Sequence, residues 1–421
     1  MKKVSVYLLA LFLAAFLAVT AFASTLLSPS LEIIAADCEM LKSAPLHEDV
    51  EFTKDDFCLA AGAEIKSITI TSLPPSGDGS LLLGTSRVST NQTISAANLN
   101  LLRFVPASGV SNTSFRFTYD RSYTTECVIN ILDHENSAPV ADVALAVPVW
   151  TQCDVSCYGN LKGYDPDGDR IIFEVTEYQS EGLLEITDKE AGSYIYTPYS
   201  GFRGVDSFSY RIRDEYGCYS DEYKMTVKID KRVTDMVMSD MDGHWGQNAA
   251  MVMVADGVMD VISENGKNYF DPDEIITRED FLMSVMKSFG AGELSPRATV
   301  FADNSAISSE TSGYVAAAYK LGIIKGENRN GQLYFRPNDS ITRAEAAAIL
   351  NRIIGAEASG AVSVFADESA STAWAVADLY AISELGIISC DASGSIGAST
   401  PLDRAQTAQM LMNAKFLFEA E

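Results

Sequence analysis

Two stretches of the chain alternate apolar and polar residues in short runs, which is the period-two pattern of half-buried β-strands. The first stretch covers residues 46–135. The second covers residues 139–231, with clear runs at 171–175, 194–196, 208–212 and 225–229. This pattern predicts two all-β, antiparallel sandwiches of about 90 residues each, joined by a short linker at residues 136–139.

The pattern changes to that of amphipathic helices in the C-terminal part of the chain. After Thr342, apolar residues recur at positions i, i+3, i+4 and i+7, namely Ala346, Ile349, Leu350 and Ile353. Thr342 and Glu345 match a capping box at a helix start, and Asp403 with Gln406 is a close variant. The pattern therefore predicts helices that each bury one face.

This helical part is an internal repeat. Three similar runs begin at Gly257, Gly322 and Gly386, which are 65 and then 64 residues apart. Three further positions are equivalent in the copies. Twelve residues before the glycine stands Trp245, Glu310 or Trp374, and an aspartate precedes that position (Asp240, Asp303, Asp367). After the glycine comes a helix start that contains an arginine (Arg278, Arg343, Arg404). We expect three repeats of helix, glycine stop, loop and helix, at residues 233–292, 298–356 and 362–419.

The arginine in each helix start is the feature that helix formation does not explain. A cation at the positive end of the helix dipole costs a few tenths of a kcal/mol, so the residue needs another reason to be there. A guanidinium beside unpaired helix N–H groups forms a site for an anion, and its fork suits a carboxylate. We therefore favour ligand binding over a purely structural role for Arg278, Arg343 and Arg404.

Together these features resemble the S-layer homology (SLH) domain, with three copies from residue 233 to about residue 418. The resemblance implies one all-α, pseudo-threefold helical bundle whose grooves bind a secondary cell-wall polysaccharide, often through a pyruvylated sugar. Carried over by position, it implies one glycan-binding group per copy: Asp240, Trp245, Gly257 and Arg278 in the first; Asp303, Gly322 and Arg343 in the second; Asp367, Trp374, Gly386 and Arg404 in the third.

The copies are not identical. The tryptophans could stack on a sugar or belong to the core. The second copy carries Glu310 where the others carry tryptophan. The third copy lacks the Phe-x-Pro sequence that precedes the arginine motif in the other two. Not every groove is therefore expected to bind glycan.

The second β unit resembles the bacterial cadherin-like and immunoglobulin-like repeats of surface proteins, and the first unit resembles them more distantly. The resemblance rests on residues 165–169, 194–198 and 201–210. It implies a spacer or adhesive module, in a family many of whose members bind calcium. Asp165, Asp167 and Asp169 offer oxygen ligands for Ca²⁺ in a turn that Gly168 permits, and a solvated turn is the alternative. The chain requires no other cofactor.

The N-terminus predicts export. Two lysines, an apolar run and the small residues Ala21 and Ala23 match a signal peptide at residues 1–23, with an uncleaved membrane anchor as the alternative. Residues 24–45 are expected to form a linker. Export permits disulfides, and one per β unit is expected, although the pairing stays open among Cys58, Cys127, Cys153, Cys157 and Cys218. Cys390 is expected as a free thiol.

Composition narrows the functional class. The formal net charge of −26 disfavours binding to nucleic acid or to anionic lipid. The only histidines, His47, His134 and His244, are isolated, and no segment of enzyme-domain size remains. We predict a non-catalytic protein of the cell surface, secreted and anchored to cell-wall glycan, with no membrane contact after signal cleavage. The alternatives are an S-layer lattice subunit that self-associates and an enzyme whose site lies in the first β unit.

Overall fold

A computed structural model describes residues 39–119, 124–141, 149–292, 299–358, 365–367, 373–391 and 394–419. The chain divides into two compact units: the first comprises Met1–Pro139, Asp165–Arg170 and Arg213–Tyr219, and the second comprises Val140–Tyr164, Ile171–Ile212 and Ser220–Glu421. Within the described ranges, no helix has the length and apolar character needed to cross a bilayer. The expected signal peptide at residues 1–23 lies outside these ranges.

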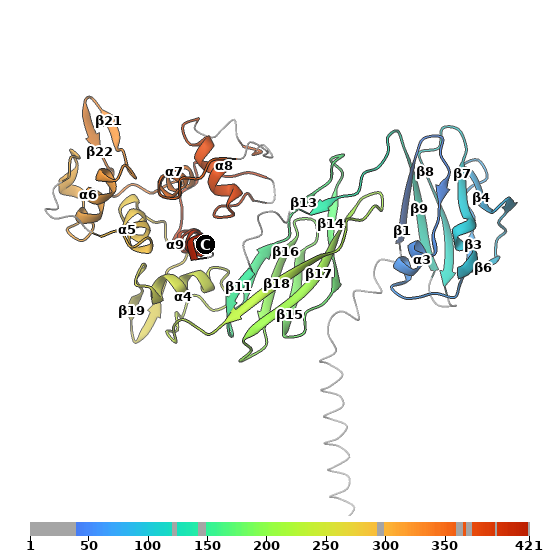
Figure 1. The fold of residues 1–421 in the computed structure, drawn as a ribbon, viewed down its shortest axis with the longest axis horizontal. Helices are drawn as coiled ribbons and strands as arrows, with labels where there is room; N and C mark the ends of the chain where they lie inside the picture. Colours follow the sequence, from blue (N-terminus) through green and yellow to red (C-terminus); the bar gives the residue numbers. More distant parts are fainter. Residues whose placement is uncertain are drawn as a thin grey trace, which may run out of the picture. The chain divides into compact units, whose positions relative to one another are not determined.

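The first β region is built from two sheets (Figure 1). One sheet has the strand order β1-β9-β8-β3-β6, and the other has the order β2-β7-β4-β5. Strand β1 runs parallel to β9, whereas β8 runs antiparallel to both β9 and β3. The elements are β1 (Glu39–Pro45), β2 (Val50–Glu51), α3 (Lys54–Ala61), β3 (Ser67–Ser72), β4 (Gly79–Leu83), β5 (Ser86–Arg87), β6 (Thr93–Ser95), the 3₁₀ helix η1 (Ala96–Leu101), β7 (Leu102–Pro106), β8 (Asn112–Tyr119) and β9 (Thr124–Leu132).

Aromatic side chains from both sheets and from α3 fill the core of this region. Phe104 comes from one sheet, Phe115 and Phe117 from the other, and Phe57 from the helix, and all are fully buried. The rings of Phe57 and Phe117 meet edge to face at 5.1 Å. Such contacts add to the free energy gained from burying the rings. Helix α3, which the strand pattern did not predict, starts at a capping box and supplies part of this core.

The linker predicted at residues 24–45 is wrong for its last seven residues. Glu39–Pro45 forms β1, which pairs with β9 from Glu126 to Leu132. Only Met40 and Ala44 of this strand are buried, so its apolar signal is too sparse to stand out in the sequence. The strand forms because β9 offers it a free edge. The remaining linker residues lie outside the described ranges.

The second β region also contains two main sheets, with the strand orders β11-β18-β17-β14 and β12-β16-β15, and a small pair, β10-β13. Tyr194, Tyr196, Phe208 and Tyr210 dominate its core. The elements are β10 (Val140–Ala141), β11 (Val149–Gln152), β12 (Cys157–Asn160), β13 (Gly163–Tyr164), β14 (Ile171–Glu177), β15 (Gly182–Asp188), β16 (Ser193–Pro198), β17 (Gly204–Asp214) and β18 (Tyr223–Asp230).

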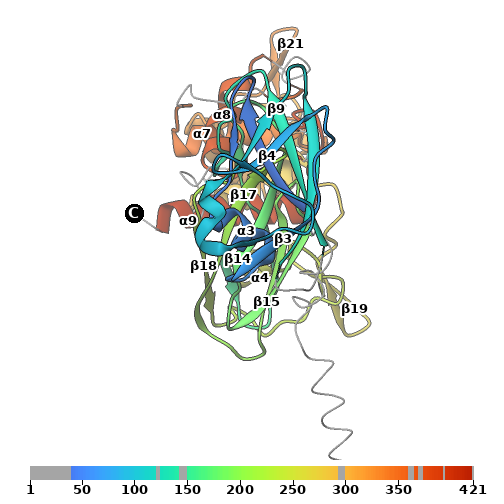
Figure 2. The ribbon, with the colours of Figure 1, turned by 90° about the vertical axis from the view of Figure 1, so that its right-hand side faces the viewer.

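The C-terminal region is helical, but it is not all-α as predicted. Two β-hairpins, β19-β20 and β21-β22, project from the helices in both views (Figures 1 and 2). Each hairpin follows the glycine stop of its repeat and has only three residues per strand, too short for a periodic signal. The elements are α4 (Gln247–Ala255), β19 (Ile262–Glu264), β20 (Lys267–Tyr269), α5 (Arg278–Ser288), η2 (Asn304–Ala306), α6 (Ser312–Lys320), β21 (Glu327–Arg329), β22 (Gln332–Tyr334), α7 (Arg343–Ile354), α8 (Val376–Glu384) and α9 (Arg404–Glu419).

The repeats interlock instead of folding one by one. The second helix of each repeat packs against the first helix of another: α5 against α6, α7 against α8, and α9 against α4. Their buried side chains belong to one hydrophobic core. Short backbone bridges between the helix starts, such as Thr277 with Ser340 and Thr342 with Pro401, tie the repeats together. No repeat could therefore bury its apolar face alone.

The second β region is joined to the helices inside the second unit. Gln152, at the end of β11, is fully buried, and its Nε2 donates to Oδ1 of Asn248 at 2.9 Å. Its Oε1 accepts from the backbone N–H of Val233 at 2.7 Å. The ring of Trp150 meets that of Phe416 at 4.9 Å. Because buried polar groups need such partners, this contact favours one relative position of β11 and α4.

Candidate functional site

Each of the three predicted arginines reaches across to a different repeat. Arg278, Arg343 and Arg404 are the first residues of α5, α7 and α9. Their Nε atoms donate to the backbone oxygens of Phe335 at 3.1 Å, Ile396 at 2.7 Å and Phe270 at 2.7 Å, respectively. The first repeat thus contacts the second, the second contacts the third, and the third contacts the first.

The three aspartates hold the loops whose carbonyl groups receive these arginines. Asp240 accepts from the N–H groups of Phe270 and Asp271. Asp303 and Asp367 do the same with the equivalent residues of their own loops. The second loop residue adopts a left-handed conformation in each case, at Asp271, Arg336 and Gly397. The carboxylates are therefore occupied by backbone donors and act on the site through the loop.

The three glycines end the first helix of each repeat. Gly257, Gly322 and Gly386 have φ angles of 67°, 76° and 71°, a region that suits glycine because it has no Cβ. In the first and third repeats, the backbone oxygen three residues after the glycine accepts a hydrogen bond from an arginine. Nη2 of Arg404 donates to Asp260 at 2.7 Å, and Nη2 of Arg343 donates to Ser389 at 2.6 Å.

The grouping of site residues by repeat, as the sequence suggested, is wrong. Arg278 lies with the loop held by Asp303, Arg343 with the loop held by Asp367, and Arg404 with the loop held by Asp240. We name these the Arg278, Arg343 and Arg404 sites. The sequence period shows which residues are equivalent, but helix packing decides which repeat each arginine meets.

The tryptophans are exposed, which excludes their placement in the core. Trp245 is 39% exposed and Trp374 is 57% exposed, and Glu310 is exposed as well. The residue after Trp245, Gly246, lies so close to Ala405 that an added Cβ would be 3.0 Å from that side chain. The backbone next to Trp245 therefore approaches the first turn of α9, and the exposed ring of Trp245 is available to stack on a ligand.

The sites differ in charge. Nη1 of Arg278 forms an ion pair with Oε1 of Glu345 at 2.9 Å, and both side chains are largely buried. Arg343 and Arg404 form no ion pair with any residue in the described part of the chain. Burial lowers the pKa of Arg278 and of Arg343 below the ordinary value. Guanidinium groups stay protonated near neutrality even so, and the unpaired Arg343 and Arg404 favour an anionic ligand.

A second candidate site lies in the first unit, at the aspartate turn. Asp165, Asp169 and Asp214 each present a carboxylate oxygen within 4.8 Å of the others. Asp165 and Asp214 are 8% and 1% exposed. Oδ2 of Asp165, Oδ2 of Asp169 and Oδ1 of the neighbouring Asn136 have no hydrogen-bond partner in the described structure. Burial and the nearby Asp165 and Asp214 raise the pKa of Asp169.

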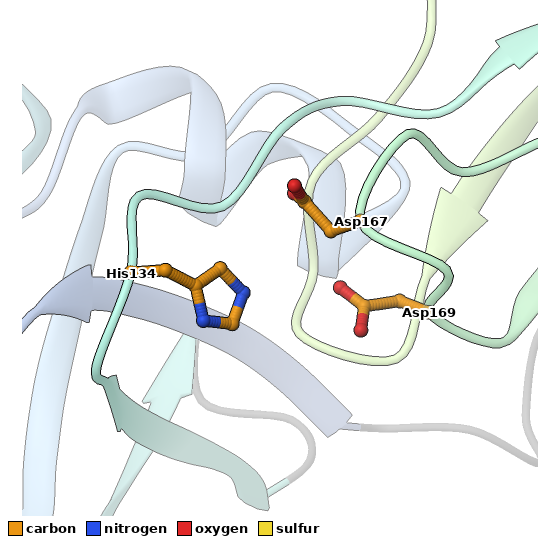
Figure 3. Close-up of side chains that lie close together, drawn as sticks. All are labelled: His134, Asp167 and Asp169. Carbon is orange, nitrogen blue, oxygen red and sulfur yellow. The ribbon is translucent and has the colours of Figure 1, made fainter.

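The structure does not bring the predicted trio of Asp165, Asp167 and Asp169 together in one group. Asp167 turns away, and its Oδ2 accepts from the backbone N–H of Ser137 at 2.7 Å, which lowers its pKa. With Asp169 it faces the ring of His134 on the outside of the turn (Figure 3). Asp214 takes the place of Asp167 in the buried group, because strand β17 ends beside the turn. The spacing within the turn could not reveal a ligand 45 residues further on.

The predicted disulfides are absent from the described part of the chain. Cys58, Cys127, Cys153, Cys157, Cys218 and Cys390 are all unpaired, as was expected only for Cys390. Cys127 and Cys157 pack in apolar cores, where a thiol behaves as a small hydrophobic residue. Burial raises the pKa of Cys157 to about 12. Cys38 lies outside the described residues.

Comparison with known families agrees with this architecture. A model of the bacterial Ig domain matches residues 136–230, and a model of the S-layer homology domain matches residues 237–282, 300–347 and 364–408. The chain is thus a repeat-bearing protein of the bacterial cell surface, associated with the cell wall. It carries a bacterial Ig domain followed by three SLH repeats.

Three relatives share short segments with the chain. Over 113 residues it is 38% identical to exoglucanase XynX of Acetivibrio thermocellus and 30% identical to the surface-layer 125 kDa protein of Lysinibacillus sphaericus. Over 112 residues it is 35% identical to the amylopullulanase of Thermoanaerobacterium thermosulfurigenes. Each match covers 26% of this chain but only 10%, 9% and 6% of the respective relative. The similarity therefore concerns a shared module and not the whole proteins.

Proposed function

We propose that the SLH repeats anchor the chain noncovalently to a secondary cell-wall polysaccharide, and that the β regions are displayed as adhesive or spacing modules. In this proposal the repeats form a pseudo-threefold bundle, and the first β region is a divergent second sandwich. The observation that carries the proposal is the pair of cross-repeat arginines, Arg343 and Arg404, which keep a positive charge without a carboxylate partner in the described structure. An anionic sugar such as a pyruvylated one supplies the missing carboxylate.

Cosedimentation of the full chain with protein-free sacculi tests this proposal. Sacculi of the producing bacterium are used before and after acid removal of their secondary polymers. We expect binding that is lost on stripping, and a loss of at least about tenfold in affinity for R343Q/R404Q, since each charged hydrogen bond contributes about 1.5–3 kcal/mol. Arg203→Gln, an exposed residue in the second β region, removes the same charge elsewhere and should change nothing. Absence of binding to native sacculi would refute the anchor.

Catalysis is not part of this proposal. Nδ1 of His244 accepts from the backbone N–H of Gly246, and Nδ1 of His134 bonds to Asp133, so both histidines have structural partners. The alternatives remain an enzyme site in the first β region and a lattice subunit. Hydrolysis of soluble polysaccharides by the full chain would support the first, and two-dimensional sheets in electron micrographs would support the second.

We also propose that the buried acidic group binds Ca²⁺. The supporting observation is the set of unpartnered oxygens on Asp165, Asp169 and Asn136, together with the buried carboxylate of Asp214. These are hard oxygen ligands of the kind that calcium requires, and a cation would relieve the repulsion between the carboxylates. The ion would hold the aspartate turn against the end of β17.

Isothermal titration with CaCl₂ after chelation tests the calcium site. We expect one bound ion in the full chain and its loss in D214N. D167N is the matched control, because Asp167 faces away from the buried group. Equal loss in both variants would contradict the assigned ligands, and no heat with the full chain would refute the site.

A further inference from the structure

The three arginine sites share one plan, and their difference in charge centres on the third residue of the facing helix. This residue is Glu345 in the Arg278 site, Gln406 in the Arg343 site and Asp280 in the Arg404 site. The side chains of Glu345 and Gln406 accept from the backbone N–H of the N-cap residues Thr342 and Asp403. The side chain of Asp280 accepts from the hydroxyl of its N-cap residue, Thr277. Three different side chains therefore bond to the N-cap residue of their own helix at this position.

In the Arg278 site this residue neutralises the arginine. Oε1 of Glu345 lies 2.9 Å from Nη1 of Arg278 and 2.6 Å from Nη2 of Arg336, while its Oε2 accepts from the N–H of Thr342 at 3.1 Å. The side chains of Arg278 and Glu345 are 11% and 16% exposed. The carboxylate is thus held from three sides in a place with little access to water.

The other two sites lack this internal partner. Gln406 carries no charge, so it cannot pair with Arg343. Asp367, Asp391 and Asp403 act on this guanidinium only at longer range, without an ion pair in the described structure. Asp280 is shorter by one methylene than glutamate, and its Oδ2 accepts from Oγ1 of Thr277 at 2.6 Å instead. In both sites the arginine Nη2 donates to a backbone oxygen, at Ser389 or Asp260. A neutral carbonyl group orients the guanidinium without cancelling its charge.

We propose that the three sites are unequal: the Arg343 and Arg404 sites bind the anionic group of the glycan, whereas Glu345 closes the Arg278 site by acting as its internal counter-ion. This inference rests on the proposed anchoring function and adds which sites perform it. An incoming carboxylate at Arg278 would have to displace Glu345 from two guanidinium groups and a helix cap. Breaking a buried pair in this way leaves an uncompensated charge, which is strongly unfavourable.

The test compares matched Arg→Gln variants of the full chain, because glutamine keeps an N–H donor for the loop carbonyl. The probe is native sacculi stripped of protein. We expect R343Q and R404Q each to weaken binding by about tenfold or more, and R278Q to change it by less than twofold. A loss with R278Q as large as that with R343Q, at unchanged melting temperature, would overturn the inference. Absence of binding by the unaltered chain would instead refute the proposed anchoring function.

A second experiment tests whether removing the charge of Glu345 increases binding. In the weakly binding R343Q/R404Q background, E345Q should open the Arg278 site and increase the affinity at least about tenfold. Glutamine is tolerated at this position, since Gln406 caps α9 in the third repeat. D280N in the same background makes the same charge change at the equivalent position away from Arg278, and should restore nothing. Restoration by D280N, or none by E345Q in a folded protein, would refute the role of Glu345.

Discussion

Arg404 and Phe270 are 134 residues apart in the chain, yet Nε of Arg404 donates to the backbone oxygen of Phe270 at 2.7 Å. The guanidinium carbon also lies 4.8 Å from the centre of the Phe270 ring, within the range of a cation–π contact. The last helix of the third repeat is thereby fixed to the first repeat. The arginine that we propose as a glycan ligand therefore also joins two repeats of the helical region.

Removal of the third repeat should destabilise the first. A chain ending at Gly355 uncovers α4, whose Ala249, Ala250 and Met253 are fully buried. Exposure of several such side chains costs about 0.8 kcal/mol per methylene-sized group, so we expect a loss of several kcal/mol. Urea unfolding followed by fluorescence measures it. A chain ending at Leu417 is the control, and equal stability of the two would contradict the interlocked core.

The exposed tryptophans should affect binding and not stability. Trp245→Ala should weaken sacculus binding several-fold, because the exposed ring is next to Gly246, which lies against Ala405 beside Arg404. Its removal should change the free energy of unfolding by less than about 0.5 kcal/mol, as for most surface substitutions. Cosedimentation and thermal unfolding measure the two effects. A large loss of stability would show that Trp245 contributes to the hydrophobic core.

The junction between β11 and α4 should depend on Gln152. Gln152→Ala leaves Oδ1 of the buried Asn248 without its partner, which costs about 1–3 kcal/mol, and it also removes the bond to the N–H of Val233. A double-mutant cycle with Asn248→Ala measures the coupling in urea. Additive effects of the two substitutions would show that the contact contributes nothing to the junction.

Asp169 should make the calcium-free protein sensitive to pH. The folded-state pKa of Asp169 is raised by burial and by the carboxylates of Asp165 and Asp214. A raised pKa favours folding below the ordinary aspartate value, and this contribution is lost as the pH rises through the folded value. In a chelator, Asp169→Asn should therefore melt a few degrees higher than the unaltered chain at about pH 7, and this advantage should shrink toward about pH 4.

The effect of Asp169→Asn on the melting temperature should change sign when Ca²⁺ is added. With the ion present, the same substitution removes a ligand and should lower the melting temperature. Asp167→Asn serves again as the control, because its carboxylate bonds to Ser137 instead of joining the buried group. An Asp169→Asn variant that melts below the unaltered chain in chelator would contradict the electrostatic repulsion.

The described cysteines should behave as free thiols. Alkylation of the denatured, unreduced chain followed by mass spectrometry should label Cys58, Cys127, Cys153, Cys157, Cys218 and Cys390. In the folded protein Cys127 should resist labelling, since burial raises its thiol pKa well above the ordinary value. Protection of Cys58 and Cys127 in the denatured chain would restore the disulfide that the sequence suggested.

The sequence alone determined the repeat and the identity of the equivalent residues. Their period, the glycine stops and the helix caps are local properties, so the sequence shows them directly, and their resemblance to SLH repeats is confirmed. The separate resemblance of residues 165–169, 194–198 and 201–210 to bacterial immunoglobulin-like repeats is confirmed as well. The exposed state of Trp245 stayed open, because a tryptophan has the same local signal in a core and on a surface. Strand β1 was missed for a related reason, since only two of its residues are buried.

Only the tertiary structure decided which residues meet. Arg278 faces Glu345 of another repeat, and Asp214 joins Asp165 from the far end of a strand. Both relationships depend on how helices and loops pack across long separations in sequence. The sequence therefore shows each arginine as a candidate ligand-binding residue. Whether a carboxylate of the protein neutralises it, as Glu345 does for Arg278, is decided by the packing of the molecule. The physical reason is that electrostatic partners are set by distance in space, and the order of residues does not contain that distance.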